Sequence, residues 1–518
     1  HFFIFGLGCG QCLPYAIISL ERRVFMVQSV QNEVYDFGNS CKHFWKKYRT
    51  PLFVLSLLLL LSISSILRAN FKYVDDIGRT VNGYRGWSNF SRYLSSFFSI
   101  FLHGDTYLTD ISPLPQVLAI FVMGISSILL LHLFSNGKKI TFWNILAVIP
   151  LTINPYFLEC LSYKYDAPYM AISILSSIVP FLFYKKNKVL FGISSFCGLL
   201  IMCLTYQASS GIYLLLIFFY AFLLYKEDTN WKKIASFILY AGVLYLGSLL
   251  VYKLFFMQTV EDYVSNTLFS LLELPGGFLR NLGTYYDLLF HDFKVEWLIF
   301  IGVLVIGFLI ATTLTAKKHK VITFLVTLFV LACSGLVLFG IYPAFTSPLF
   351  SPRAMYGFGA FLSLVMVQIS NFPRSYFLKV ISFCLCFLFV SFSFTYGNAL
   401  SEQKDYTEYR MYLVASDLNH LEIMNNPQIK QVKIVGDIGQ APVIRNMPQD
   451  YQILTRLIPS TFGGGNVWSS AYFFSYLDLK NLTISTDDSL LELDLPVLVD
   501  TMYHEIRGDD AHIIITLK

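Results

Sequence analysis

Long apolar runs separated by short polar connections dominate the chain up to residue 396. The first run, PLFVLSLLLLLSISSIL, occupies residues 51–67. A helix of about 20 apolar residues crosses a hydrocarbon core of roughly 30 Å and satisfies its own backbone hydrogen bonds. Asn154-Pro155 interrupts the third run. We predict eleven spans, at residues 51–67, 113–134, 141–155, 167–184, 189–206, 210–225, 234–256, 296–315, 321–341, 354–370 and 378–396.

Basic residues occur in every second connection between these runs. They fall in KHFWKKYR before the first span and then in NGKK, YKKNK, YKEDTNWKK, TAKKHK and FPRSYFLK. Lys and Arg in short loops favour the cytoplasmic side. The N-terminus is therefore expected in the cytoplasm, and the alternate connections outside. These outward segments are longer than the cytoplasmic connections and contain more of the polar and aromatic residues that could act on a substrate. They comprise residues 68–112, 155–166, 257–295, 342–353 and 397–518.

The pattern divides the chain into three parts. Residues 1–50 form a cytoplasmic or interfacial segment, in which residues 1–25 are either an added extension or an apolar hairpin on the membrane. Residues 51–396 form the transmembrane domain. Residues 397–518 are expected to form a small outward α/β domain, with a helix in EQKDYTEYRMYLVASDLNHL, strands in QVKIVGDIG and AHIIITLK, and a flexible FGGGN.

One outward segment has a different periodicity. SNFSRYLSSFFSIFLH, residues 88–103, has apolar residues at positions 90, 93, 94, 97, 98 and 101. This spacing is typical of one face of a helix, and the opposite face is Ser, Asn and Arg. We predict an amphipathic helix lying in the headgroup plane.

Composition agrees with a helical polytopic membrane protein and excludes a soluble enzyme. Apolar residues make up 55% and charged residues 14% of the chain, against about 25% charged in soluble domains. Residues 397–518 carry 9 Lys and Arg against 16 Asp and Glu, and the preceding residues carry 29 against 17. Topology accounts for this asymmetry, so we expect no nucleic-acid partner. The nine cysteines are scattered, and the isolated Cys9-Gly-Gln-Cys12 is a weak metal or redox signal.

Two adjacent carboxylates follow the first apolar run. Asp75 and Asp76 lie in FKYVDDIGRT, residues 71–80. Neighbouring side chains diverge by about 100° on a helix, so only one of the two can point at a given atom. One interpretation is an acting carboxylate beside an orienting one. The other is a solvated helix with Asp75–Arg79 and Lys72–Asp76 pairs at i, i+4.

A carboxylate at the headgroup plane can act as a general base when a lipid-linked sugar phosphate reacts with an acceptor hydroxyl. The departing phosphate then needs a cation. Arg353, in the Pro-rich YPAFTSPLFSPR, offers a bidentate guanidinium. The alternative for Arg353, and for Lys164 in LSYKYD, is an interfacial anchor.

Further polar and aromatic candidates lie in the outward segments. Glu159 and Asp166 flank LSYK, and Tyr165 lies between Lys164 and Asp166. Tyrosines here either stack on sugar rings or form the ordinary interfacial belt. His291 and Asp292 lack a convincing metal-ligand spacing, so neither a metal nor another cofactor is expected.

The order FKYVDDIGR, GYRGWSNFSRYLSSFF and NPYFLECLSYKYDAPYM resembles that of the bacterial and phage serotype-converting O-antigen glucosyltransferases, the Gtr type, within the polytopic GT-C class. The resemblance covers roughly residues 45–400. It implies transfer of a hexose, usually glucose, from undecaprenyl phosphate to an O-antigen or lipopolysaccharide acceptor, with inversion. The reaction would take place on the periplasmic face of the bacterial inner membrane, among the lipids of that membrane.

The resemblance places its acidic motif on Asp75 and Asp76. We favour Asp76 as the base, because Arg79 at i+4 is better placed to hold Asp75. The residues that we expect to bind substrate are Arg79, Arg353, Lys164, Tyr165, Asp166 and Glu159.

Two other functions remain open. A lipid-linked oligosaccharide ligase or polymerase would show several arginines in a long outward loop, whereas residues 257–295 contain only Arg280 and Lys294 as basic residues. A polyprenyl-sugar flippase or transporter would need ionisable groups within spans or paired interrupted helices.

Overall fold

The computed structural model describes residues 42–135, 137, 139–258, 267–316, 319–447, 451–479 and 481–518, although not the side chains of residues 466–468. The chain divides into two units, residues 1–54 and 55–518. In the first unit, residues 42–54 are helical. The alternatives for residues 1–25 and the Cys9–Cys12 signal lie outside the described residues. All that follows concerns the second unit.

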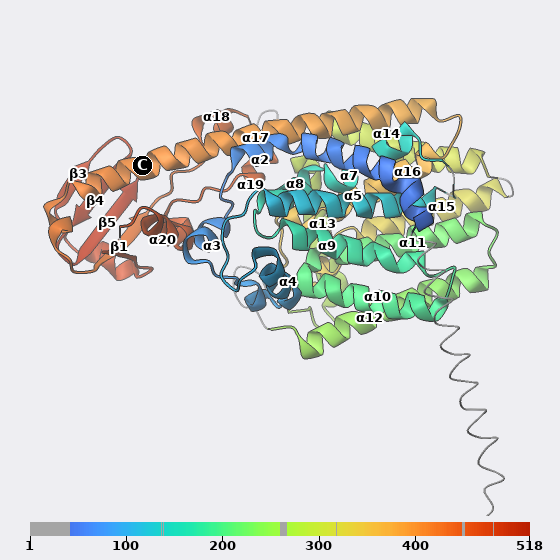
Figure 1. Cartoon of the computed structure of the whole chain (residues 1–518), viewed down its shortest axis with the longest axis horizontal. Helices are drawn as coiled ribbons and strands as arrows, with labels where there is room; N and C mark the ends of the chain where they lie inside the picture. The colour runs from blue at the N-terminus through green and yellow to red at the C-terminus, as the bar shows by residue number, and fades with distance from the viewer. Residues whose placement is uncertain are drawn as a thin grey trace, which may run out of the picture. The chain divides into compact units, whose positions relative to one another are not determined.

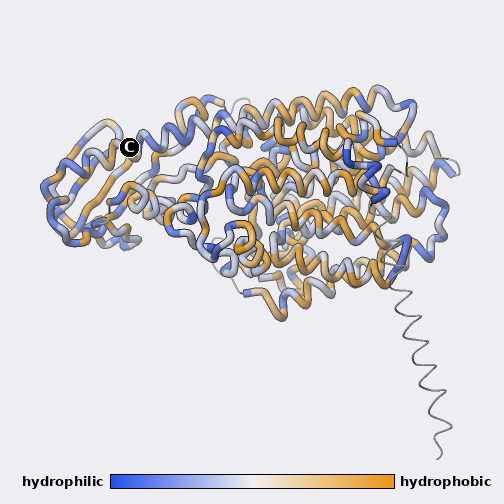
Figure 2. Tube along the Cα trace, viewed as in Figure 1, coloured by the Kyte–Doolittle hydropathy of each residue, from blue (hydrophilic) through white to orange (hydrophobic). Residues whose placement is uncertain are grey.

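Apolar helices form most of the second unit (Figure 1). Figure 2 shows apolar residues along these helices, hydrophilic residues in the connections at their ends, and a mixture of both in the sheet. Among the described residues, seven helices are long and apolar enough to cross a membrane, which supports membrane association. They are α5 (Leu114–Phe134), α10 (Lys188–Thr205), η3 with α11 (Gln207–Ser209 and Ser210–Lys226), α12 (Trp231–Phe255), α14 (Val295–Leu314), α15 (Lys320–Val337) and α17 (Tyr376–Asn419).

The third predicted span is broken. Three short helices, α6 (Phe142–Ala147), α7 (Ile149–Thr152) and α8 (Pro155–Ser162), occupy this region, and the chain bends by 62° between Thr152 and Pro155. The Asn154 side chain accepts hydrogen bonds from the backbone N–H groups of Tyr156 and Phe157, and Pro155 lacks an N–H. An Asn cap followed by Pro starts a new helix. Counted as one span, this region would be the eighth.

The prediction of eleven spans is not confirmed. Residues 55–62 are helical and are followed by the separate α2 (Ser64–Ala69). The helices α9 (Ala167–Ile178) with η2 (Val179–Leu182), and α16 (Gly357–Ser370), are apolar but short. The 14 residues of α16 are about 21 Å long at 1.5 Å per residue. The predicted apolar runs are therefore helical, but not every one has the length of a complete span.

The predicted amphipathic helix forms as α4 (Tyr93–His103), after the 3-10 turn η1 (Trp87–Phe90). Its serine face packs inward, because Ser95 is buried and its Oγ donates to the Thr205 carbonyl oxygen at 3.2 Å. On the other face, Phe97 is 51% and Phe101 73% exposed. The amphipathic helix is confirmed, and its location in the headgroup plane stays a prediction.

The helix α17 runs without a break from the bundle into the C-terminal part of the chain (Figure 1). In the bundle it packs against α2, and Ser65 Oγ donates to the Ser393 carbonyl oxygen at 3.1 Å. Residue 397, the predicted start of the C-terminal domain, is inside this helix. A Cβ atom on Gly397 would lie 2.3 Å from Ser65 Oγ, so glycine permits the close approach of α17 and α2.

A mixed five-stranded sheet follows, with the strand order β2-β1-β5-β4-β3. The presence of this sheet agrees with the α/β tail that the sequence predicts. The two predicted strands form as β1 and β5, and β1 pairs in parallel with both β2 and β5. The antiparallel β5–β4 and β4–β3 pairs complete the sheet. The strands are β1 (Lys430–Val435), β2 (Leu482–Ile484), β3 (Val497–Asp500), β4 (His504–Gly508) and β5 (His512–Leu517).

The remaining helices connect these parts. Those of the predicted outward segments are α3 (Asp76–Asn82), α13 (Leu274–Asp292), η4 (Tyr342–Ala344) and η5 (Pro352–Ala354). Those around the sheet are η6 (Glu422–Asn425), α18 (Pro442–Asn446), α19 (Leu454–Leu457), η7 (Gly464–Asn466), α20 (Val467–Tyr476) and η8 (Asp488–Glu492).

The helix α3, which carries Asp76, packs into the apolar core of the sheet. Ile77 is fully buried there with Met411, Val414 and Val432. Against the same helix, a Cβ atom on Gly78 would lie 2.6 Å from Cε2 of Tyr472 in α20. The position of Asp76 therefore depends on elements more than 300 residues further along the chain.

Candidate active site

Four segments that are distant in sequence meet in the structure. They are residues 70–113, 155–166, 342–356 and 451–458, which we call the loop cluster. Hydrogen bonds join them: the Tyr73 hydroxyl donates to the Leu457 carbonyl oxygen at 2.6 Å, and Ser351 Oγ donates to Glu159 at 3.1 Å. The first three segments largely coincide with the predicted outward segments 68–112, 155–166 and 342–353. The fourth belongs to the tail, and its participation was not predicted.

Asp76 is completely buried at the start of α3. Its Oδ2 accepts hydrogen bonds from the backbone N–H groups of Tyr73, at 3.0 Å, and Lys164, at 3.1 Å. Its Oδ1 has no hydrogen-bond partner among the described residues. Burial raises the pKa of Asp76 to about 8, against the opposing effects of the Lys164 N–H and the Arg79 charge. The site thus contains an oriented carboxyl group with one unused oxygen.

Asp75 has a different environment from Asp76. This difference agrees with the prediction that the two neighbouring side chains point in different directions. The Asp75 side chain is 37% exposed, and its Oδ2 lies 3.6 Å from Arg79 Nη2, which confirms the predicted i, i+4 contact. The alternative Lys72–Asp76 pair is absent from the described residues. Lys72 Nζ instead lies 4.5 Å from the ring centroid of Tyr476.

Arg79 and Asp166 form a buried ion pair that joins α3 to the start of α9. The guanidinium carbon of Arg79 lies 4.5 Å from the ring centroid of Trp87, and Trp87 Nε1 donates to Asp166 Oδ1. Both predicted substrate-binding residues thus hold protein segments together here. Direct contact with substrate stays a prediction for them.

Lys164 and Tyr165 lie close to Asp76. Lys164 Nζ donates to Asn70 Oδ1 and lies 3.4 Å from Asp110 Oδ2. Burial lowers the pKa of Lys164, and the Asp110 carboxylate opposes this shift. The Tyr165 hydroxyl lies 3.2 Å from Thr80 Oγ1, which itself donates to the Asp76 carbonyl oxygen at 2.7 Å. Both residues are therefore next to α3, as the sequence predicts for a shared site.

Glu159 and Arg353 also come together, although 194 residues separate them. The Arg353 backbone N–H donates to Glu159 Oε2 at 2.5 Å, and Arg353 Nη1 lies 3.5 Å from Glu159 Oε1. Arg353 Nη1 also donates to the Tyr163 hydroxyl. The expected free bidentate fork of Arg353 is thus partly occupied by protein groups.

Sequence reasoning missed a second ion pair at the loop cluster. Arg456, from α19, pairs with Asp292 at the end of α13 and donates to the Phe350 carbonyl oxygen. The Tyr156 hydroxyl donates to the same Asp292 oxygen at 3.1 Å. Only the basic character of Arg456 in an acidic tail could have indicated this role, because nothing in the sequence brings α19 and α13 together.

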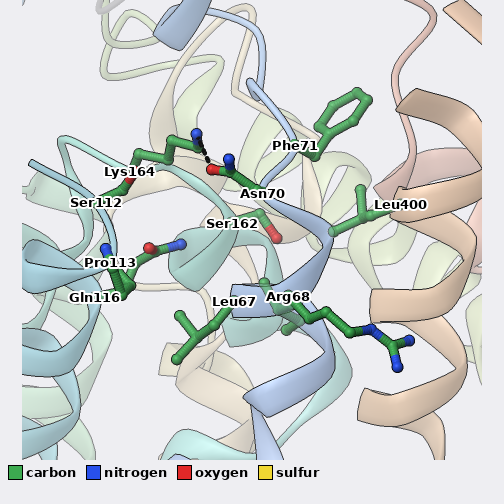
Figure 3. A pocket seen from close by; sticks show the side chains of 11 residues that line it. Leu67, Arg68, Asn70, Phe71, Ser112, Pro113, Gln116, Ser162, Lys164 and Leu400 are labelled. Carbon is green, nitrogen blue, oxygen red and sulfur yellow. Dashed lines mark hydrogen bonds between the residues drawn. The ribbon is translucent and has the colours of Figure 1, made fainter. Parts of the chain in front are cut away.

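A pocket of about 310 Å³ is lined by Lys164 (Figure 3). The backbone N–H of the same residue donates to Asp76 Oδ2. Part of the pocket wall is polar and part apolar. Arg68, which was not among the predicted candidates, lines it from α2. The lining residues are Ile66, Leu67, Arg68, Asn70, Phe71, Ser112, Pro113, Gln116, Ser162, Lys164 and Leu400.

Comparisons with known proteins identify the family of the chain. Residues 64–364, which contain three of the four segments of the loop cluster, match the family described as glucosyl transferase GtrII. A relative from Salmonella phage P22, described as an uncharacterised 55.3 kDa protein in the gtrB 5′ region, is 24% identical over 440 residues. These residues cover 81% of this chain and 88% of the relative. No solved structure matches the chain. Because the family match covers more than half of its length, the chain belongs to the GtrII glucosyl transferase family and is a glycosyltransferase.

Proposed function

We propose that this glycosyltransferase moves glucose from a polyprenyl-phosphate carrier to an O-antigen acceptor on the periplasmic face of the bacterial inner membrane. Family membership supports the glucosyl group. The apolar helices and the exposed aromatic face of α4 support a substrate presented at a membrane surface. The basic connections predicted to be cytoplasmic support the outward orientation of the loop cluster.

The observation that carries the proposal is the hydrogen bonding of the two carboxyl oxygens of Asp76. Two backbone N–H groups fix its Oδ2, and Oδ1 has no partner among the described residues. A buried polar atom without a partner is costly, so its persistence indicates a role for that atom. A carboxylate oxygen of fixed direction suits general-base catalysis.

In this mechanism Asp76 Oδ1 accepts the proton of the acceptor hydroxyl as the acceptor oxygen attacks the anomeric carbon. The bond between that carbon and the phosphate oxygen breaks, and its electron pair leaves with the phosphate. Attack opposite to the leaving group inverts the anomeric configuration. The charge on the phosphate requires a cation, and the loop cluster contains Arg79, Lys164 and Arg353.

Asp75 is the weaker candidate for the base. Its side chain is 37% exposed, and its Oδ2 lies 3.6 Å from Arg79 Nη2. We infer that Asp75 helps to hold Arg79.

The transporter alternative has less support. The described residues contain one bent helix pair, and its carboxylate Glu159 is already bonded to Arg353 and Ser351. The ligase alternative would require a pyrophosphate-linked oligosaccharide donor, whereas the family is one of glucosyl transferases.

Transfer of labelled glucose from purified polyprenyl-phosphate-glucose to an O-antigen acceptor tests the proposal. We expect Asp76→Asn to lower kcat by about 100-fold or more, because general-base catalysis contributes about 10²–10⁴-fold. Asp75→Asn is the matched control and should retain most of the activity. Full activity in Asp76→Asn would disprove the assignment of the base. Transport of the lipid-linked sugar across proteoliposomes without any transfer would favour the transporter.

A further inference from the structure

The backbone turn that carries Asp76 is strained. In the turn of residues 73–76, the Asp76 N–H donates to the Tyr73 carbonyl oxygen at 2.9 Å, and the Tyr73 N–H donates to Asp76 Oδ2 at 3.0 Å. Between these two residues, Val74 has a φ of 41°. This left-handed conformation is unfavourable for a β-branched residue and persists only where surrounding contacts enforce it. Contacts outside the turn must therefore hold it in place.

The Tyr73 side chain supplies such contacts. It is buried, and its ring centroid lies 4.7 Å from that of Tyr163, whose hydroxyl accepts a hydrogen bond from Arg353. The Tyr73 hydroxyl donates to the Leu457 carbonyl oxygen of α19 at 2.6 Å. A hydrogen bond between buried groups is costly to lose, because no water replaces it. The hydroxyl therefore fixes Tyr73 relative to α19.

The helix α19 is a firm support, because other segments hold it. Arg456 pairs with Asp292 of α13 and donates to the Phe350 carbonyl oxygen. The Tyr396 hydroxyl of α17 also donates to the Leu457 carbonyl oxygen, at 3.4 Å. The carbonyl group that accepts the Tyr73 hydroxyl is thus fixed to the bundle as well as to the C-terminal part of the chain.

We propose that Tyr73 is a positioning residue for glycosyl transfer, and that its hydrogen bond to α19 holds the strained turn and thereby directs Asp76 Oδ1 toward the acceptor hydroxyl. This inference rests on the proposed function, because it takes Asp76 as the base. It adds that one hydroxyl group makes the orientation of the base depend on the C-terminal part of the chain. Without that hydroxyl, Val74 relaxes to a negative φ, and the Tyr73 N–H loses its alignment with Asp76 Oδ2.

Removal of the hydroxyl alone tests the proposal. Tyr73→Phe keeps the ring and its contact with Tyr163, and loses the hydrogen bond to Leu457. We expect kcat to fall about tenfold or more, because a displacement of about 1 Å can cost about 10²-fold. KM should change by less than about twofold, because only the chemical step is affected. Glucose transfer from polyprenyl-phosphate-glucose measures both constants.

The pH dependence of kcat/KM separates positioning from a general loss of activity. Burial is the largest cause of the raised pKa of Asp76, which is about 8. A relaxed turn lets water reach the carboxyl group, so the midpoint of the pH profile should move to lower pH in Tyr73→Phe. An unchanged profile would show that the turn keeps its structure without the hydroxyl, and would overturn the proposal.

Tyr285→Phe is the matched control. Tyr285 on α13 is also buried, and its hydroxyl donates to the Leu349 carbonyl oxygen at 2.8 Å. The variant therefore loses the same kind of hydrogen bond within the loop cluster, but at a place that does not hold the 73–76 turn. We expect Tyr285→Phe to keep kcat and the pH profile. Equal losses of kcat in the two variants would overturn the specific role of Tyr73.

A second substitution tests the strain. Glycine adopts a positive φ without steric cost, so Val74→Gly should keep the turn when the hydroxyl is absent. We expect Tyr73→Phe to lower kcat less in the Val74→Gly background than in the wild-type background, which a double-mutant cycle measures. Equal losses in both backgrounds would overturn the claim that the hydroxyl holds a strained turn.

Hydrogen exchange separates this inference from the proposed function, because it needs no substrate. We expect residues 70–82 to exchange faster in Tyr73→Phe than in wild type or Tyr285→Phe, as mass spectrometry of the peptides measures. If Asp76→Asn lowers transfer but Tyr73→Phe changes neither exchange nor kcat, the positioning role is overturned and the function stands. If Tyr73→Phe exchanges faster but Asp76→Asn retains full transfer, the base is overturned and the attachment of the turn to α19 stands.

Discussion

Asp75 and Asp76 are adjacent in sequence and differ in every property that bears on proton transfer. Asp75 is exposed and faces a guanidinium, whereas Asp76 is buried and has an oxygen without a partner among the described residues. The sequence predicted that the two side chains would diverge and that Arg79 would hold Asp75. It could not predict the burial of Asp76, because the Lys164 N–H and the core around Ile77 come from distant segments.

The raised pKa of Asp76 predicts the pH dependence of the enzyme. In the proposed mechanism the ionised carboxylate is the base, and its population increases as pH rises through a pKa of about 8. We therefore expect kcat/KM to rise about tenfold per pH unit below this pKa and to level off above it. Initial rates of glucose transfer measured between about pH 6 and pH 9.5 test this dependence. Asp75→Asn should keep the profile, and a flat profile would show that Asp76 does not titrate in catalysis.

Ionisation of the Asp76 carboxyl group, which should raise activity as pH rises, should lower the stability of the folded chain. The pKa of this group is about 8 in the folded chain and about 3.9 in an unfolded chain. Between these values the folded state binds more protons, so this group's contribution to stability falls as pH rises. We expect Asp76→Asn to lose less thermal stability than wild type between pH 6 and pH 8.5, roughly the upper part of this range. A melting temperature of the variant that falls as steeply as that of wild type would contradict the buried ionisation.

At the scale of elements, α3 belongs equally to the proposed active site and to the core of the sheet. Ile77 enters that core, and Gly78 allows the Tyr472 ring to contact the helix backbone. The sequence predicted the amphipathic α4 and the strands β1 and β5 from local periodicity. It could not predict the packing of α3 on α20, because no local pattern records a contact between residues 78 and 472.

A methyl group at Gly78 should disturb the site through this packing. The new Cβ would lie 2.6 Å from Tyr472 Cε2, so either the ring or α3 must shift. We expect Gly78→Ala to lower kcat more than it raises KM, because Asp76 is displaced, and Tyr472→Ala to restore part of the activity in the double variant.

Gly302→Ala is the matched control, because nothing lies within 4 Å of a Cβ at that position in α14. Equal activity of Gly78→Ala and Gly302→Ala would show that α3 is not positioned by Tyr472.

At the scale of the whole molecule, the C-terminal part of the chain forms contacts with the bundle beyond those of α17. The Leu457 carbonyl oxygen accepts the Tyr73 hydroxyl, and Arg456 pairs with the buried Asp292. The apolar runs and the composition predicted membrane association, and local patterns in the tail predicted the strands β1 and β5. The sequence could not predict that α19 contacts the loop cluster, because a single sequence does not show which distant residues form ion pairs.

Loss of the Arg456 charge should destabilise the protein. Removing one partner of a buried ion pair leaves an uncompensated charge and costs about 3–5 kcal/mol when both partners are fully buried. The Arg456 side chain is 18% exposed, so we expect a smaller cost for Arg456→Met, about 2–3 kcal/mol after discounting for solvent. Thermal unfolding in detergent measures the change in stability.

The surface arginine of α18 provides the control, because Arg445 is exposed. Asp292→Asn combined with Arg456→Met should recover part of the loss. A melting temperature of Arg456→Met equal to that of Arg445→Met would show that the pair contributes nothing.

The continuity of α17 has a consequence for substrate choice. Its 44 residues measure about 66 Å at 1.5 Å per residue, roughly twice the thickness of a hydrocarbon core. One continuous helix thus connects the bundle to the core that contains Ile77, so that in the proposed orientation the protein fixes the height of Asp76 above the lipid. In the proposed donor, the reacting carbon is one oxygen atom away from the carrier phosphate, whatever the length of the isoprenoid chain below it. The enzyme should therefore be indifferent to carrier length and selective for the distance between the phosphate and the sugar.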